Sequence, residues 1–288
     1  MAYYLNADAY LAEDRIYYSA DSYKIDYDNE IIYANGHALF RKHNKIVNAD
    51  RIIIYYARGQ KKAKLFNNVV FLNEQNKNRI SGDYGEVLYN EDIYTVEGNT
   101  VFTDGEIKIT SDKVSTYKGE ETAFSGNVEY SDGEYEIKAP ILSIMDDEAA
   151  FKKKSEALHV ESGDIIYCGT ISFNTKTGDA VFLDDVLYVQ NEEEGEDALL
   201  MKSDATRFFK QSDTYLFIGN VFVLNKDFTA QSSVARYNRN EDVLNIMGNI
   251  VLQEDDKFTY CTNANYDEKN EKTVLYNEVK GIMFDKLK

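Results

Sequence analysis

The chain has 288 residues, and its 50 acidic against 32 basic residues give a formal net charge of −18. This charge argues against a nucleic-acid-binding protein, because phosphate backbones attract a cationic surface, and an acidic surface also repels anionic membranes. No apolar stretch reaches the roughly 18 residues that a membrane-spanning helix needs.

The first residues, 1–6, lack the basic region and the apolar stretch of a secretory signal peptide. We therefore expect either a cytosolic protein or a form from which a targeting segment has been removed.

The composition favours β-strands. Tyr and Phe number 23 and 15, whereas Pro occurs once, and no segment keeps an apolar period of about 3.6 residues. The length would allow two ordinary domains, but no Pro-rich, Ser-rich or low-complexity break interrupts the chain. The sequence predicts one domain over residues 1–288 with almost no helix.

A short corner motif, resembling Gly-Asn-Val and flanked by apolar residues, recurs along the chain. In chain order it reads Gly36-His37-Ala38, Asn67-Asn68-Val69, Gly98-Asn99-Thr100, Gly126-Asn127-Val128, Asp184-Asp185-Val186, Gly219-Asn220-Val221, Gly248-Asn249-Ile250 and Asn277-Glu278-Val279. Gly at this position predicts a bend, a bulge or a close approach of another backbone, and Asn tolerates turn conformations.

A second motif, a small residue usually followed by Asp, alternates with the corner. Its copies are Ala20-Asp21, Ala49-Asp50, Gly82-Asp83, Ser111-Asp112, Ala139-Pro140, Gly163-Asp164, Ser203-Asp204 and Ser232-Ser233. A strand-like stretch generally follows it. Each repeat is therefore interpreted as two strand segments joined by two turns.

The spacing of the corners predicts a repeat architecture. Successive corners are about 28 to 35 residues apart, except for one step of about twice that length, where we place a degenerate copy at Leu158-His159-Val160. About nine repeats of about 29 residues, clear over 16–284, then stack on their neighbours as a solenoid.

Apolar residues two before, two after and four after the corner share one strand parity, so they face the same way. Those predicted to line the interior are Leu65, Val69, Phe71, Val96, Phe102, Phe124, Val128, Phe182, Val186, Phe217, Val221, Ile246 and Ile250. These columns fit two structures: a dry core that holds two sheets together, or an apolar trough that stays open at one side.

Catalytic and metal-binding motifs are absent from the sequence. The three histidines, His37, His43 and His159, form no pair at metal-ligand spacing, and His37 takes the position of a corner Asn. Acidic pairs such as Asp184-Asp185 and Asp255-Asp256 are interpreted as turns. We expect no enzymatic activity, no metal and no cofactor, and we predict that Cys168 and Cys261 are free thiols because they lie about three repeats apart.

The alternation of the two motifs resembles the OstA-like family of lipopolysaccharide-transport proteins, the LptA type. The clearest copies pair Ser111-Asp112 with Phe124-Ser125-Gly126-Asn127-Val128, and Ser203-Asp204 with Phe217-Ile218-Gly219-Asn220-Val221. The resemblance covers residues 16–284, and its specificity comes from recurrence at matching intervals.

This resemblance implies an elongated β-jellyroll, or β-taco, of two opposed antiparallel sheets. It also implies a periplasmic bridge protein whose apolar trough carries the acyl chains of lipopolysaccharide or a related glycolipid toward the outer membrane. The thirteen interior residues named above are then expected to line this trough and bind lipid, and other OstA-like components are expected to add through edge strands. The family provides no catalytic residues. The chain is about twice as long as the familiar soluble members by repeat count. Its negative charge fits a multiply phosphorylated lipid poorly, so another glycolipid or a phospholipid is an alternative ligand. The alternative function is a structural or adhesive β-solenoid with a filled core.

Overall fold

The computed structural model describes residues 16–57, 59, 61–75, 77–118, 120–190, 199–254, 257–267, 269–270 and 272–283. It divides into two compact units, unit 1 within residues 1–132 and unit 2 within residues 133–288, which are described separately. The prediction of a single domain over 1–288 stays a prediction.

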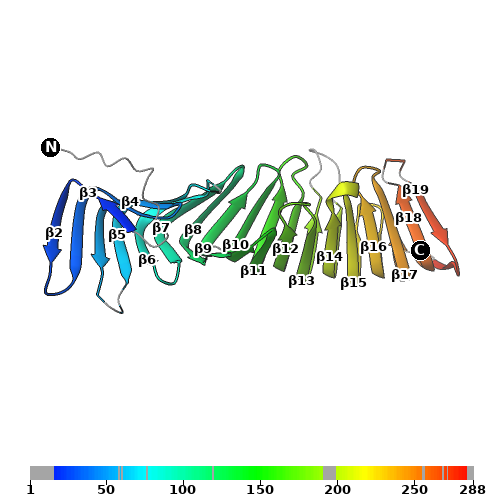
Figure 1. Ribbon diagram of the computed structural model, residues 1–288. Coiled ribbons are helices and arrows are strands. Elements are labelled where there is room, and N and C mark those ends of the chain that lie inside the picture. Colours follow the sequence, from blue (N-terminus) through cyan, green and yellow to red (C-terminus); the bar gives the residue numbers. More distant parts are fainter. Residues whose placement is uncertain are drawn as a thin grey trace. The chain divides into compact units, whose positions relative to one another are not determined.

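Unit 1 consists of nine strands. They are β1 (Ile16–Ser19), β2 (Ser22–Asp26), β3 (Ile31–Lys42), β4 (Lys45–Tyr55), β5 (Lys62–Asn73), β6 (Arg79–Leu88), β7 (Ile93–Asp104), β8 (Ile107–Tyr117) and β9 (Glu121–Ser131). From β3 onward each strand pairs antiparallel with the next one in the chain, and Figure 1 shows this succession.

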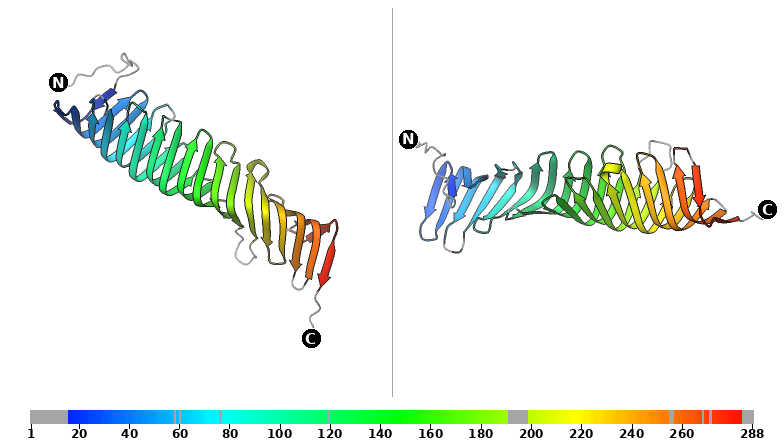
Figure 2. Two further views of the ribbon diagram at one scale, coloured as in Figure 1. Left: turned by 90° about the horizontal axis from the view of Figure 1, so that it is seen from below. Right: turned by 45° about the vertical axis from the view of Figure 1, so that its right-hand side comes forward.

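Unit 2 continues the same pattern. Its strands are β10 (Tyr135–Met145), β11 (Glu148–His159), β12 (Ile165–Asn174), β13 (Ala180–Val189), β14 (Leu200–Phe209), β15 (Thr214–Leu224), β16 (Thr229–Asn238), β17 (Val243–Glu254), β18 (Lys257–Asp267), β19 (Lys272–Tyr276) and β20 (Lys280–Met283). One 3₁₀ turn, η2 (Lys210–Ser212), joins β14 to β15. In Figure 1 and Figure 2 the strands from β3 to β9 in unit 1, and from β10 to β18 in unit 2, lie side by side in chain order. The all-β, antiparallel fold class is confirmed.

The corner motif forms a bulge in the middle of a long strand. In β3 the pairing with β4 jumps from Asn35–Arg51 to Ala38–Ala49, and the two residues between, Gly36 and His37, have φ values of 75° and 42°. Left-handed φ favours Gly and is tolerated by Asn, which explains the composition of the motif. The predicted bulge is confirmed.

The second motif provides the partner of the corner. The Asn Nδ2 of a corner donates to the Asp carboxylate of the preceding strand: Asn68 to Asp50 at 2.9 Å, Asn99 to Asp83 at 2.9 Å, Asn127 to Asp112 at 3.1 Å and Asn220 to Asp204 at 2.9 Å. His37 Nδ1 replaces the amide in the first copy, 2.8 Å from Asp21 Oδ2. This hydrogen bond raises the pKa of His37, and the predicted turn role of His37 is confirmed.

At four corner glycines, the Asp carboxylate of the second motif lies against the position that a Cβ would take: Gly36, Gly98, Gly126 and Gly219. A Cβ on Gly126 would collide with the carboxylate of Asp112. The close approach that we expected from another backbone is therefore made by a side chain.

One predicted corner was misplaced. The bulge of β11 falls at Lys153-Lys154, with φ values of 70° and 57°, and not at Leu158-His159-Val160. Lys153-Lys154 was missed because it contains neither Gly nor Asn, although the buried Phe151 precedes it at the usual distance.

Each strand bend divides the ladder into two halves that face each other. We call the turns after β3, β5 and the later odd-numbered strands through β17 the first edge, and the turns after β4, β6 and the later even-numbered strands through β18 the second edge. Phe40, near the first edge, packs on Tyr89 at the second edge with ring centroids 5.8 Å apart, and Phe228 packs likewise on Tyr266 at 5.1 Å. The predicted opposed sheets are thus the two halves of bent, continuous strands.

Replacing Gly126 with Ala is expected to lower the free energy of unfolding by about 2–3 kcal/mol, since the left-handed φ costs an L-residue about 1–2 kcal/mol and the methyl group also displaces Asp112. Gly105→Ala is the matched control, because Gly105 has a φ of 59° but nothing within 4 Å of the position that an added methyl group would take. In urea denaturation, that control should lose about 1 kcal/mol of its free energy of unfolding. Equal losses for both variants would show that the carboxylate does not constrain the corner.

Candidate functional site

The facing halves enclose one apolar interior in each unit. All thirteen residues predicted to line it are buried, none above 6% exposure. In unit 1 they are Leu65, Val69, Phe71, Val96, Phe102, Phe124 and Val128, and in unit 2 they are Phe182, Val186, Phe217, Val221, Ile246 and Ile250. The shared parity therefore places them on the inner face of the bent strands, while their role in lipid binding stays a prediction.

Aromatic side chains fill the space between the halves. Phe102 contacts Phe124 with centroids 5.5 Å apart, and Phe71 contacts Tyr94 at 5.2 Å. In unit 2, Tyr188 contacts Phe217 at 5.8 Å. Each pair joins a residue on the first-edge side of the corner to one on the second-edge side, so the columns of the two halves pack on each other.

In each unit, the first and second edges meet opposite the corners along a line that we call the mouth of that unit. Among the described residues, the backbone hydrogen bonds outside the strand ladders join residues of the same edge or lie at a corner. The two halves are thus covalently continuous at the corner, and at the mouth they are connected by side chains.

In unit 1 two lysines of the first edge reach the second edge. Lys45 Nζ lies 2.5 Å from Asp92 Oδ2 and 4.8 Å from the ring centroid of Tyr94. Lys42 Nζ donates to the carbonyl oxygen of Tyr89 at 2.7 Å. Both contacts span 47 residues, from the β3–β4 turn to the β6–β7 turn.

In unit 2 two ion pairs bridge the mouth. Glu134 at the first edge pairs with Lys210 at the second. Asp164, also at the first edge, lies 3.3 Å from Arg239 Nε at the second edge and accepts a hydrogen bond from the Tyr188 hydroxyl at 3.0 Å. None of these pairs was predicted from the sequence as a bridge.

The bridging pairs differ in burial, and burial decides their strength. Asp164 and Arg239 have side chains only 4% and 16% exposed, so removing one partner would leave a buried charge, at a cost of about 3–5 kcal/mol. Lys210 and Glu134 are 42% and 38% exposed, and a pair so exposed contributes about 0–1 kcal/mol. The Lys45–Asp92 pair, 23% and 39% exposed, lies between these cases.

The pKa shifts of the groups at the mouth agree with these ion pairs. Burial raises the pKa of the Asp92 carboxyl, but the hydrogen bond and charge of Lys45 outweigh burial and hold that pKa below its usual value. Burial lowers the pKa of the Arg239 guanidinium, yet nearby Tyr215, Asp164 and Asp213 outweigh it and raise the pKa. Burial, together with the charge of Arg239, lowers the pKa of His159.

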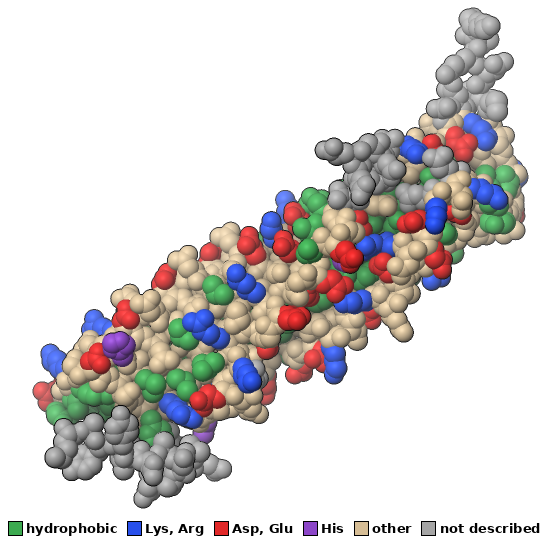
Figure 3. All heavy atoms as spheres, turned by 90° about the horizontal axis from the view of Figure 1, so that it is seen from above, with side chains coloured by type: hydrophobic (Ala, Val, Ile, Leu, Met, Phe, Trp, Pro, Cys, Tyr) green, Lys and Arg blue, Asp and Glu red, His purple; other side chains and the backbone are tan. Residues whose placement is uncertain are grey.

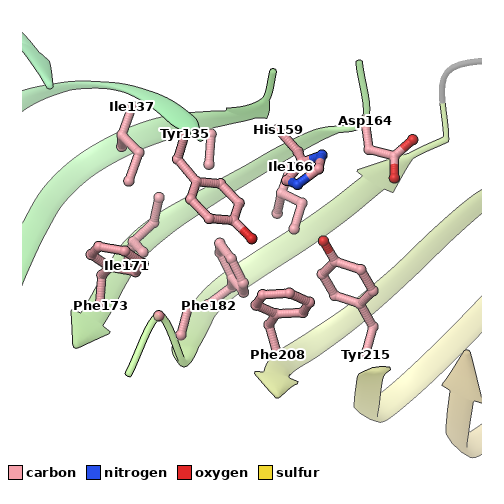
Figure 4. A pocket seen from close by; sticks show the side chains of 13 residues that line it. Tyr135, Ile137, His159, Asp164, Ile166, Ile171, Phe173, Phe182, Phe208 and Tyr215 are labelled. Carbon is pink, nitrogen blue, oxygen red and sulfur yellow. The ribbon is translucent and has the colours of Figure 1, made fainter. Parts of the chain in front are cut away.

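A small cavity of about 20 Å³ lies beside the Asp164–Arg239 pair (Figure 4). The hydroxyl groups of Tyr135 and Tyr215 point toward its centre, with His159 and Asp164 at its polar end and Phe182 and Phe208 below. Its volume suits about one water molecule. The interior of unit 2 is closed at this point by aromatic rings.

A larger cavity of about 90 Å³ opens at the mouth of unit 1. Its lining includes the apolar side chains of Phe71, Ile80, Tyr94 and Phe102, together with the cation of Lys45. The rest of the lining consists of Leu72, Asn73 and Asn78 near the first edge and Thr116 and Thr122 near the second edge. The cavity therefore combines an apolar lining with one cation.

The remaining candidate residues occupy structural positions. Cys168 and Cys261 are buried and free, as predicted, and burial raises the pKa of Cys168 to about 12. Asp184-Asp185 forms the corner of β13, while Asp255-Asp256 lies outside the described residues. In the described part of the chain there is no group of three or more His, Cys, Asp and Glu placed to hold a metal ion, and no helix long and apolar enough to cross a membrane.

Charges of both signs are interspersed on the face of the molecule seen in Figure 3. The acidic excess of the sequence therefore does not gather into one patch on that face.

No protein-family model matches the chain, and no curated protein matches it. Among solved structures, one similar chain is LptH from Pseudomonas aeruginosa, described as the LptA-homologous periplasmic component of the conserved lipopolysaccharide transport device. The two are 11% identical, the match covers 73% of this chain and 97% of LptH, and the TM-score is 0.21. At this level the match does not bear on the ligand, partners or location of this chain.

Proposed function

We propose that the chain is a periplasmic lipid-binding bridge protein that carries lipopolysaccharide or a related glycolipid along its apolar interior toward the outer membrane. The motifs that resemble the OstA-like family support this proposal, as does the arrangement of apolar columns on the inner faces of bent strands. In this proposal the chain catalyses no reaction and shields acyl chains from water, while the polar head group stays outside.

The side-chain connection across the mouth is the observation that carries the proposal. The halves can separate about the corners by breaking side-chain contacts such as Phe102–Phe124, while every backbone ladder from β3 to β9 is kept. Because ladder hydrogen bonds are costly to leave unmade, an interior that opens without breaking them is suited to admitting an acyl chain.

Complete burial of the columns favours a second candidate, a structural β-solenoid with a filled core. Phe217 and Leu65, for example, are 0% exposed. Protein interiors are close-packed, and a permanent core would have this burial whether or not the protein ever binds lipid.

Lipid co-purification separates the two candidates. The chain is purified from diderm bacterial cells without detergent, denatured, extracted and examined by mass spectrometry, with an acidic β-protein of similar size carried through the same steps. We expect a glycolipid or phospholipid in near-stoichiometric amount from this chain alone. Extracts that match the control would leave the structural solenoid as the function.

We also propose that partners dock by strand addition. β1 and β2 pair with β3, and β19 and β20 pair with β18; the described residues supply no strand on the other side of these four. Exposed apolar side chains accompany both ends, including Tyr17, Tyr18 and Ile282. Unpaired strand edges are ready templates for another chain, here a second OstA-like component.

Proline placed in a terminal strand is expected to weaken head-to-tail association, measured by sedimentation velocity. Alternate residues of an edge strand point their N–H groups outward, so Tyr17→Pro and Tyr18→Pro are made separately, together with Val274→Pro, and one of the first two removes an outward donor. Tyr27→Pro, in the turn after β2, is the control. Unchanged association in all three variants would exclude docking through these edges.

A further inference from the structure

The Lys45–Asp92 pair adjoins the cavity at the mouth of unit 1, because Lys45 is one of the residues that line it. The Lys45 Nζ contacts both Asp92 Oδ2, at 2.5 Å, and the face of Tyr94, which also lines the cavity. The pair connects the two edges, so it must separate if the mouth widens at this point. A fixed cation beside an apolar space is the pattern expected for an anionic amphiphile, whose charge and chain need these two surroundings together.

We propose that Lys45 is a head-group site for an anionic lipid, and that the Lys45–Asp92 pair is a latch which such a lipid releases by exchanging its own anionic group for the Asp92 carboxylate. The acyl chain then enters between Phe71 and Phe102. This assignment rests on the proposed lipid-binding function and specifies its entry point and the charge of its ligand.

Partial exposure makes the exchange feasible. The Lys45 and Asp92 side chains are 23% and 39% exposed, so an incoming phosphate can reach the ammonium group while Asp92 regains water. The Asp164–Arg239 pair of unit 2 is nearly inaccessible by comparison, at 4% and 16%. The adjacent Lys42 bonds a carbonyl oxygen of Tyr89, which an anionic group can replace in the same way.

The experiment follows withdrawal of pyrene-labelled lipid from phosphatidylcholine vesicles by the intact protein. Pyrene-phosphatidylglycerol is the anionic probe, and pyrene-phosphatidylcholine with the same chains is the zwitterionic one. We expect the natural protein to withdraw the anionic probe roughly two- to fivefold faster, the range that an exposed charge interaction allows, and this preference should fall as salt is added.

Two substitutions act in opposite directions. Asp92→Asn removes the competing carboxylate. This variant should withdraw the anionic probe roughly two- to fivefold faster than the natural protein does. Lys45→Gln also breaks the latch but removes the cation, so the preference for the anionic probe should disappear while the zwitterionic probe is still withdrawn. Lys113→Gln is the control, because Lys113 pairs with Glu97 at 2.7 Å within one half of the ladder, near a corner, and should change neither rate.

A Lys45→Gln protein that keeps the full preference for the anionic probe overturns the head-group site, and an unchanged rate in Asp92→Asn overturns the latch. Failure of the natural protein and of all variants to withdraw either probe instead overturns the lipid-binding function on which the site rests.

Discussion

Replacing Phe217 with Asp is expected to abolish the cooperative unfolding transition of unit 2. Phe217 is 0% exposed and packs against Tyr188 and Tyr215, with centroid distances of 5.8 and 6.2 Å. Loss of a buried Phe costs about 3–5 kcal/mol, and burying an unpaired carboxylate adds several more. The sum is comparable with the whole stability of a typical domain, about 5–15 kcal/mol.

Urea denaturation followed by circular dichroism measures this effect. Phe209→Asp is the control, since Phe209 ends the neighbouring strand β14 but is 41% exposed, and it should shift the stability by less than about 1 kcal/mol. A folded Phe217→Asp protein that no longer retains lipid would mean that the carboxylate reaches water, as in a permanently open trough.

The milder Phe217→Ala variant relates this packing to function. An apolar cavity in a folded interior binds apolar molecules, and ligand binding to the native state raises stability by mass action. If the interior accepts acyl chains, lipid should restore more stability to Phe217→Ala than to Phe209→Ala. Equal effects of lipid on both variants would favour the filled structural core.

The sequence predicted the columns well because strand parity is a local property. Leu65 and Val69, for instance, flank a corner that is visible as Asn67-Asn68, and two-residue periodicity fixes their common face. The pairing of each corner with its Asp could also have been predicted, because Asp50 and Asp83 precede Asn68 and Asn99 by similar intervals. The two motifs were instead interpreted as separate turns. The corner at Lys153-Lys154 lacked any such signal.

The bridges across the mouth could not be predicted from the repeat. Which turn of the second edge faces a given turn of the first edge depends on the twist and stagger accumulated by the strands between them. Lys45 therefore meets Asp92 after 47 residues, whereas Glu134 meets Lys210 after 76. The sequence separation between bridging partners therefore differs between the two units, and no fixed interval along the chain identifies them.

Among these bridges, the Asp164–Arg239 pair should contribute most to stability. Asp164→Ala is expected to lower the free energy of unfolding by about 3 kcal/mol, the lower end of the range for a buried pair. The lower end applies because Asp213 Oδ1 stays 3.5 Å from Arg239 Nη1 and still offsets part of its charge. The Tyr188 hydroxyl also loses its acceptor, which adds to the loss.

A double substitution tests whether the stability lost in Asp164→Ala comes from the unpaired charge of Arg239. Asp164→Leu combined with Arg239→Met removes both charges and should restore stability to within about 1 kcal/mol of the natural protein, because well-packed apolar residues often replace a buried ion pair without loss. Glu254→Gln, which breaks the exposed Glu254–Lys257 pair at 3.1 Å, is the control and should cost less than about 0.5 kcal/mol. If Asp164→Ala costs no more than this control in urea denaturation, solvent screens the pair, and the pair does not hold the mouth of unit 2 closed.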